Sequence, residues 1–184
     1  MSAYTRQLLG EGLTFSSDTF YHGSKLRFEQ LELSRLRTGA DSNGKSWYGD
    51  GVYLTGVPWK AEMYGNAGYV YLVRCSVSNP FVIPGTSSVE LTPAIADGLG
   101  IPEQDADELW HDSRELTKTL VDHGYDCIAV LTDDKPSVNE LVVFDSKTCA
   151  IVSSTPVGEF DKLNRALKWP TVNYKGKRPH SHGW

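Results

Sequence analysis

The segment YGDGVYLTGVPWKAEMY, residues 48–64, constrains the fold more than any other part of this 184-residue chain. Gly49 and Gly51 lead into a short apolar run that is typical of a strand. Glycine at both positions allows either a positive φ or the close approach of another segment. Pro58 then marks the first turn of a short helix. The segment therefore predicts a tight turn, a strand and a helix in direct succession.

Two tyrosines of this segment are separated by eleven positions, Tyr53 in the predicted strand and Tyr64 at the end of the predicted helix. A strand tyrosine and a helix tyrosine can form two walls of a slot for a flat ring. The alternative is that both are ordinary core aromatics. The segment alone does not separate the two interpretations.

The overall composition predicts one globular domain of ordinary character. Hydrophobic residues make up 40% of the chain and charged residues 22%. The sequence has no apolar run of the roughly 20 residues that a membrane span needs, and its first residues do not resemble a secretory signal. We therefore expect a cytoplasmic protein without a membrane partner.

The three cysteines, Cys75, Cys127 and Cys149, are odd in number and lie in hydrophobic surroundings. This usage favours buried free thiols in a reducing compartment over a disulfide framework. No CxxC or HxxxH spacing occurs, so the sequence predicts no metal site.

Charge is distributed unevenly along the chain and suggests a boundary near residue 160. Residues 161–184 hold six of the 18 basic side chains but one of the 23 acidic ones. We expect a catalytic domain over 1–160 and a basic, aromatic tail over 161–184. Such a tail could contact phosphates and stack on bases, or it could be a solvated terminus.

Hydrophobic periodicity predicts more strands than helices, in two groups, which favours a mixed α+β domain with largely antiparallel sheets. The expected strands are 19–22, 68–78, 81–83, 125–131, 140–144 and 147–152, and the expected helices are 4–9, one starting at 58, 92–99 and 103–123.

Two polar residues occupy unusual positions for their type. His22 follows two aromatic residues in a strand, and Glu140 begins the apolar strand Leu141–Phe144. Burying a carboxylate removes its hydration, which costs on the order of several kcal/mol unless the charge is paired. Glu140 is therefore either a paired functional group or a residue at a solvent-facing strand end. His22 is either a hydrogen-bonded core residue or part of a site.

Together these motifs resemble the catalytic core of ADP-ribosyltransferases. An aromatic-His-Gly-Ser run ends at Ser24, Gly-x-Gly-Val-Tyr-Leu-Thr ends at Thr55, Tyr64 follows, and Asn-Glu-Leu-Val-Val-Phe-Asp covers 139–145. The order and gaps are similar to those of the diphtheria-toxin-like branch that includes the poly(ADP-ribose) polymerases, the His-Tyr-Glu group. The resemblance covers about residues 20–152. It implies two largely antiparallel sheets around an NAD cleft, with flanking helices.

The resemblance also implies a role for each matching residue toward NAD, the co-substrate. His22 would bind a ribose hydroxyl on the adenosine side, and Gly23 would hold the nicotinamide carboxamide through its backbone, with Ser24 beside them. Tyr53 and Tyr64 would sandwich the nicotinamide ring.

Glu140 would accept a hydrogen bond from the 2′-hydroxyl of the nicotinamide ribose. The ribose becomes cationic as nicotinamide leaves, so a fixed carboxylate stabilises the transition state more than the ground state. The expected catalytic residues are thus Glu140, His22 and Tyr53, and this chemistry needs no metal.

Two positions depart from the family pattern. Ala61 stands where the polymerase-like enzymes commonly have a serine that holds the carboxamide, so NAD binding would be weaker unless Ser24 or Thr55 compensates. Val138 replaces the Glu or Gln of arginine-directed enzymes, so we do not expect arginine as the acceptor. The short chain favours transfer of a single ADP-ribose, as in compact phage or bacterial toxin-type relatives.

Three functions remain open from the sequence. The first is mono-ADP-ribosylation of a macromolecular acceptor, protein or nucleic acid. The second is NAD hydrolysis with water as the acceptor. The third is a non-catalytic module that binds NAD or nucleic acid. The residues of the loops expected around the pocket carry no readable code for the acceptor.

Overall fold

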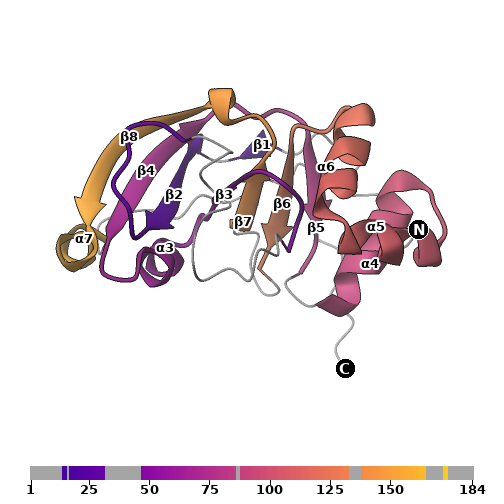
Figure 1. Ribbon diagram of the computed structural model, residues 1–184, viewed down its shortest axis with the longest axis horizontal. Helices are drawn as coiled ribbons and strands as arrows, with labels where there is room; N and C mark the ends of the chain where they lie inside the picture. Colours follow the sequence, from indigo (N-terminus) through magenta and orange to yellow (C-terminus); the bar gives the residue numbers. More distant parts are fainter. Residues whose placement is uncertain are drawn as a thin grey trace.

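A computed structural model describes residues 14–15, 17–31, 47–85, 88–132, 138–164 and 172–173. The helix expected at 4–9, residues 38–45 of the loops expected around the pocket, and most of the basic tail lie outside these ranges. The described part is a mixed α+β structure with two main sheets, as the sequence predicts (Figure 1).

The first sheet has the strand order β2-β4-β8 and is antiparallel throughout. The second has the order β3-β7-β6-β5, antiparallel except for the parallel pair β5–β6. A short antiparallel pair, β1–β9, joins residues near the two ends of the chain. The bounds are β1 Thr14–Phe15, β2 Thr19–Ser24, β3 Val52–Leu54, β4 Tyr69–Cys75, β5 Pro80–Ile83, β6 Cys127–Leu131, β7 Val138–Val143, β8 Cys149–Pro156 and β9 Val172–Asn173.

Helices flank both sheets. Figure 1 shows α4, α5 and α6 beside the β5 end of the second sheet, and α3 and α7 beside the first sheet. Their bounds are α3 Pro58–Gly65, α4 Ser88–Leu99, α5 Glu103–His111, α6 Ser113–Asp122 and α7 Val157–Asn164, with a 3-10 turn η1 at Ser146–Thr148. The predicted start of a helix at Pro58 is confirmed. No helix in the described ranges is long and apolar enough to cross a membrane.

The single helix expected over 103–123 is wrong, because the segment forms two helices that are separated at Asp112. The Asp112 carboxylate accepts hydrogen bonds from the backbone N–H groups of Arg114 and Glu115, each at 3.1 Å. This is the N-cap geometry that satisfies the free amides at a helix start. Asp112 therefore lies between the two helices and caps the second one, although the apolar periodicity of the sequence continues through this residue.

Several other boundaries differ from the predictions. Strand β7 begins at Val138, so Glu140 lies inside this strand and not at its start. Helix α4 begins at Ser88 rather than at Thr92, with Pro93 inside it. The last expected strand, 147–152, is displaced to Cys149–Pro156 because Ser146–Thr148 forms the 3-10 turn.

The boundary inferred from charge falls inside helix α7, which covers residues 157–164. The Phe160 side chain is buried against Tyr21, with ring centroids 5.8 Å apart. The change of charge near residue 160 is therefore not a break in secondary structure.

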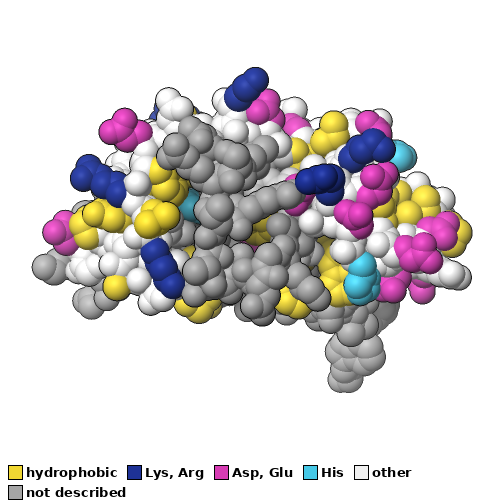
Figure 2. Space-filling view, viewed as in Figure 1, with side chains coloured by type: hydrophobic (Ala, Val, Ile, Leu, Met, Phe, Trp, Pro, Cys, Tyr) yellow, Lys and Arg dark blue, Asp and Glu magenta, His cyan; other side chains and the backbone are white. Residues whose placement is uncertain are grey.

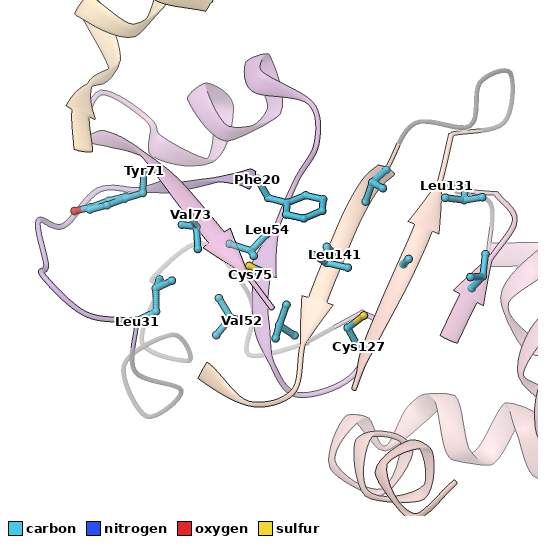
Figure 3. Packing of buried hydrophobic residues seen from close by; sticks show 14 residues of the cluster. Phe20, Leu31, Val52, Leu54, Tyr71, Val73, Cys75, Cys127, Leu131 and Leu141 are labelled. Carbon is cyan, nitrogen blue, oxygen red and sulfur yellow. The ribbon is translucent and has the colours of Figure 1, made fainter. Parts of the chain in front are cut away.

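The main core lies between the two sheets. Figure 3 shows Phe20, Leu54 and Leu141 pointing into this space from β2, β3 and β7. The alternating residues of β4 face the same core, as the sequence predicts. A second cluster packs α4–α6 onto the other face of β5, β6 and β7. Each fully buried aliphatic or aromatic side chain contributes about 1.5–3 kcal/mol, so these two clusters dominate the stability.

The two glycines before β3 have different reasons to be glycine. Gly49 has a φ of 95°, which L side chains rarely adopt. A Cβ on Gly51 would lie 2.6 Å from Cγ1 of Val142 and 2.7 Å from the Val143 carbonyl oxygen, because β7 passes close by. Both alternatives that the sequence allowed, positive φ and close approach, thus occur in one turn.

The exposed surface of α5 and α6 is acidic. Figure 2 shows acidic side chains gathered over this end of the molecule. The exposed residues there include Glu103, Asp105, Asp107, Glu108, Asp112 and Glu115. Within the described residues, this end of the domain is suited to a basic rather than a polyanionic neighbour.

Gly23 packs against the backbone of α3 and provides a test of this arrangement. A Cβ at Gly23 would lie 1.9 Å from the Ala61 carbonyl oxygen and 2.5 Å from the Gly65 nitrogen. We expect Gly23→Ala to lower the free energy of unfolding by about 3 kcal/mol or more, measured by urea denaturation. Gly158→Ala in α7 is the matched control, because no atom lies within 4 Å of its added Cβ. An equal, small effect of both substitutions would contradict the close packing of β2 on α3.

Candidate functional site

A β-bridge between β2 and the residue that follows β3 joins the two sheets. Tyr21 and Thr55 exchange two backbone hydrogen bonds, each 2.8 Å long. In an antiparallel pair, every second residue directs its N–H and C=O to the same edge. The backbone groups of Gly23 therefore face β3, as those of Tyr21 do. Among the described residues, no hydrogen bond joins Gly23 to β3, so its N–H and C=O are not used in a ladder with that strand.

The His22 side chain lies next to the Tyr21–Thr55 bridge, where the backbone pairing between β2 and the β3 segment ends. Its Nδ1 lies 2.8 Å from the Tyr53 carbonyl oxygen. Its ring lies beside the stacked rings of Phe28 and Tyr71, at centroid distances of 5.7 and 6.1 Å. A carbonyl only accepts, so Nδ1 carries the proton and donates it. Burial lowers the pKa of His22, an effect that the bond to Tyr53 partly opposes. The neutral ring then has Nε2 as a hydrogen-bond acceptor.

The carboxylate of Glu140 is paired with two side chains of α3. Oε1 accepts a hydrogen bond from the Tyr64 hydroxyl at 3.0 Å and lies 3.4 Å from Nζ of Lys60. The Lys60 and Glu140 side chains are 15% and 14% exposed, so both charges are largely removed from solvent. The structure thus favours a paired carboxylate over a solvent-facing strand end.

Tyr64 is well suited to hold this carboxylate. Burial, followed by the charge of Glu140, raises the pKa of the Tyr64 phenol far above its usual value. The phenol therefore stays protonated, and its O–H donates a hydrogen bond to Glu140. The Tyr64 side chain is nevertheless 49% exposed, so part of its ring is open to a ligand.

Helix α3 contacts both Gly23 of β2 and the Glu140 carboxylate of β7. Its Ala61 and Gly65 backbone packs on Gly23, while Lys60 and Tyr64, one turn apart, reach Glu140. Lys60 is not among the site residues that the sequence motifs predict. Its spacing of four residues from Tyr64 was the available signal, but the partner on β7 is known only from the fold.

Tyr53 is anchored by the turn that precedes β3. Its hydroxyl donates to the Gly49 carbonyl at 2.8 Å and accepts from the Tyr48 N–H at 3.0 Å. Its ring packs toward the cluster formed by α4–α6. Tyr48 lies close enough to Tyr64 to contribute to its raised pKa. The two predicted slot residues, Tyr53 and Tyr64, thus have separate hydroxyl partners.

Helix α6 holds that turn in place. The backbone N–H of Asp50 donates to the Thr117 hydroxyl at 2.6 Å, and the Ser113 hydroxyl donates to the Asp50 carboxylate at 3.2 Å. The Trp110 indole N–H also donates to the Trp47 carbonyl at 2.9 Å. The helices at the far end of the second sheet therefore position Tyr48 and Tyr53.

Two residues suggested as substitutes for a missing serine have other partners. The Thr55 side chain is buried; its hydroxyl donates to the Asn139 carbonyl at 2.6 Å and accepts from the Val57 N–H at 2.9 Å. Ser24 accepts a hydrogen bond from the Leu26 N–H at 3.2 Å in a local turn. Ala61 is fully buried beside Tyr21. The geometry gives Thr55 a structural role at the junction of the sheets.

The described groups of the site are polar and aromatic. No group of three or more His, Cys, Asp or Glu side chains in the described ranges is arranged to hold a metal ion. The groups that a planar, carboxamide-bearing ligand could contact are the Gly23 backbone, the Tyr64 ring and the Glu140 carboxylate.

Comparison with known proteins assigns no family. No protein-family model matches the sequence, and no curated protein matches it. Among solved structures, the chain is similar to an anti-CRISPR protein, at 12% identity and a TM-score of 0.39, over 80% of this chain and 98% of that chain. A similarity of this size does not assign a function, so the geometry has to be interpreted by itself.

The structural role of Thr55 can be tested by substitution. Thr55→Val removes the hydroxyl and leaves the Asn139 carbonyl and the Val57 N–H without this partner. We expect the free energy of unfolding to fall by about 1–3 kcal/mol. Thr55→Ser keeps the hydroxyl and is the control, with a smaller loss. If Val and Ser variants unfold at the same urea concentration, the hydroxyl does not support the junction.

The lowered pKa of His22 predicts a dependence of stability on pH. As the pH falls through the usual histidine pKa of 6.5, the unfolded chain binds a proton at His22, whereas the folded protein binds it only at a lower pH. The contribution of His22 to the free energy of unfolding is therefore fully present above about pH 6.5. It is lost as the pH falls from 6.5 to the pKa of His22 in the folded state. The loss is about 1.4 kcal/mol for each pH unit between the two pKa values.

The measurement compares the thermal midpoint at pH 7.5 and pH 5.5 for the parent and for His22→Asn. Asparagine keeps a donor for the Tyr53 carbonyl but does not titrate. The parent should lose more stability than the variant over this interval. Equal losses would show that His22 is not held neutral.

Proposed function

We propose that this protein is an NAD-dependent mono-ADP-ribosyltransferase with an ADP-ribosyltransferase-like fold. The observation that carries the proposal is the Glu140 carboxylate, held by Lys60 and Tyr64 on the helix that packs against Gly23. This arrangement places an anion, an exposed aromatic ring and the Gly23 peptide edge around one helix. The sequence motifs that resemble the His-Tyr-Glu group contribute all of these except Lys60.

The Gly23 peptide edge suits a primary carboxamide. Its C=O can accept from an amide NH₂, and its N–H can donate to an amide oxygen. This pair of bonds would orient the nicotinamide ring, and the half-exposed Tyr64 ring offers a face on which it can stack. His22 Nε2 is left as an acceptor for a ribose hydroxyl, because the Tyr53 carbonyl fixes the proton on Nδ1.

NAD supplies a glycosidic bond to a cationic nicotinamide ring. As this bond breaks, the ring leaves as a neutral base and the ribose gains the positive charge. The contribution of the protein is then electrostatic. The Glu140 carboxylate, fixed by Tyr64, is pre-organised to stabilise that charge at no cost of reorganisation. Tyr64 and Lys60 both contact Oε1 of Glu140, and a carboxylate with two oxygens retains acceptor capacity for a ribose hydroxyl.

The acceptor is a macromolecule, protein or nucleic acid, and a single ADP-ribose is transferred. Most of the basic tail that could contact such an acceptor lies outside the described residues. The acidic surface of α5 and α6 makes a broad nucleic-acid interface at that end of the molecule unfavourable.

The proposal predicts that Glu140→Gln loses transfer activity. The protein is incubated with NAD labelled in the adenylate half and with cell extract, and both macromolecular label and nicotinamide release are measured. Removing the carboxylate should lower both rates by about 10²–10³. Glu159→Gln, an exposed glutamate on α7, is the matched control and should match the parent.

The readouts separate the alternatives. Nicotinamide and free ADP-ribose without macromolecular label would indicate an NAD glycohydrolase. Calorimetric binding of NAD without nicotinamide release would indicate a binding module. A Glu140→Gln protein that folds normally and labels as fast as the parent would exclude Glu140 as the catalytic carboxylate.

A further inference from the structure

Two cysteines face each other across neighbouring strands, away from the proposed site. Cys75 ends β4 and Cys149 begins β8, and the two residues are directly paired in the antiparallel register. Their sulfur atoms are 3.3 Å apart, although the residues are 74 positions apart in the sequence. Both are free thiols in this structure.

The backbone around this pair has the spacing that a disulfide needs. The Cys75 N–H donates to the Asp18 carbonyl on the opposite side of β4, while the Ser76 N–H donates to the Thr148 carbonyl. Cys75 and Cys149 therefore form a non-hydrogen-bonded pair, for which the Cα–Cα distance is about 4.5 Å. Disulfides span Cα–Cα distances of about 4.4–6.8 Å. The bond can form with little movement of either strand.

The two thiols differ in access and in chemical character. Cys75 is 3% exposed, whereas Cys149 is half-buried on β8, an edge strand of the first sheet. The two sulfur atoms are within hydrogen-bonding distance of each other. This contact lowers the pKa of the Cys149 thiol, whereas the same contact and burial raise the pKa of the Cys75 thiol. Cys149 is thus the sulfur that reacts first with a solvent-borne oxidant.

We propose that Cys75 and Cys149 form a site of reversible oxidation, which a peroxide converts from a dithiol to a cross-strand disulfide. In the first step the Cys149 thiolate attacks a peroxide oxygen, an S–O bond forms, the O–O bond breaks and water leaves. In the second step the Cys75 sulfur attacks Cys149, the S–S bond forms, the S–O bond breaks and a second water leaves. Two thiols are oxidised and one hydrogen peroxide is reduced to two waters. This inference does not depend on the proposed transferase activity.

Cys127 provides an internal comparison. It is fully buried on β6 in the second sheet, and burial raises the pKa of its thiol. Both properties make it a poor target for an oxidant. Selective oxidation of Cys75 and Cys149 therefore distinguishes a built pair from general thiol damage.

The test is peptide mapping of the full chain. The native protein is treated with hydrogen peroxide, free thiols are alkylated in denaturant, and the products are digested with trypsin and analysed by mass spectrometry. Cleavage after Arg74, Lys118 and Lys147 places the three cysteines in separate peptides. We expect a linked Cys75–Cys149 peptide that disappears after reduction, with Cys127 recovered in its alkylated form.

Two variants and a thermal readout complete the experiment. Cys127→Ser should form the same link, whereas Cys149→Ser should leave Cys75 as an alkylated thiol. Oxidation should raise the thermal midpoint of the parent by roughly 5–15 °C, reversibly, and leave that of Cys149→Ser unchanged. The proposal is overturned by over-oxidised Cys149 without a linked peptide, by links through Cys127, or by a fall in the midpoint on oxidation.

Discussion

The arrangement of the molecule depends on the two backbone hydrogen bonds between Tyr21 and Thr55. They join the first sheet to the second at one residue pair and then stop, because the His22 ring takes the next carbonyl of β3, that of Tyr53. Had the ladder continued, Gly23 would have used its N–H and C=O within a sheet. The end of the ladder leaves a polar backbone edge next to a histidine, which is the chemical starting point of the site.

Helix α3 connects this edge with the carboxylate of the other sheet. It can approach β2 closely because Gly23 has no side chain, and a methyl group there would overlap the Ala61 carbonyl. From that position Lys60 and Tyr64 reach Glu140. A largely buried ion pair seldom adds to stability, since the loss of hydration offsets the attraction. The pair instead fixes the position of the Glu140 carboxylate. The cores on both faces of the second sheet offset the lost hydration.

The helices at the far end of the second sheet also serve the site. Helix α6 binds the Asp50 backbone and side chain, and the turn at Gly49 in turn binds the Tyr53 hydroxyl. A break between α5 and α6 at Asp112 sets where Ser113 and Thr117 lie. The cysteine pair follows another principle, because it depends only on the register of β4 with β8 and not on any element of the site.

The sequence by itself determined the mixed α+β class of the fold and drew attention to most residues of the candidate site. Alternation in β4, the glycines at 49 and 51, and Pro58 are local signals, and each acts through the backbone of its own segment. The anomalies of His22 and Glu140 were likewise visible from their neighbours. The division of 103–122 into two helices was not predicted. The apolar periodicity continues through Asp112 and favours one helix, whereas the Asp112 carboxylate caps a new one. Only the tertiary structure decided that Lys60 pairs with Glu140, that the Thr55 hydroxyl is used at the sheet junction, and that Cys75 faces Cys149. The physical reason is that these contacts join residues 74 to 84 positions apart, whose meeting depends on strand register and helix placement rather than on local propensity.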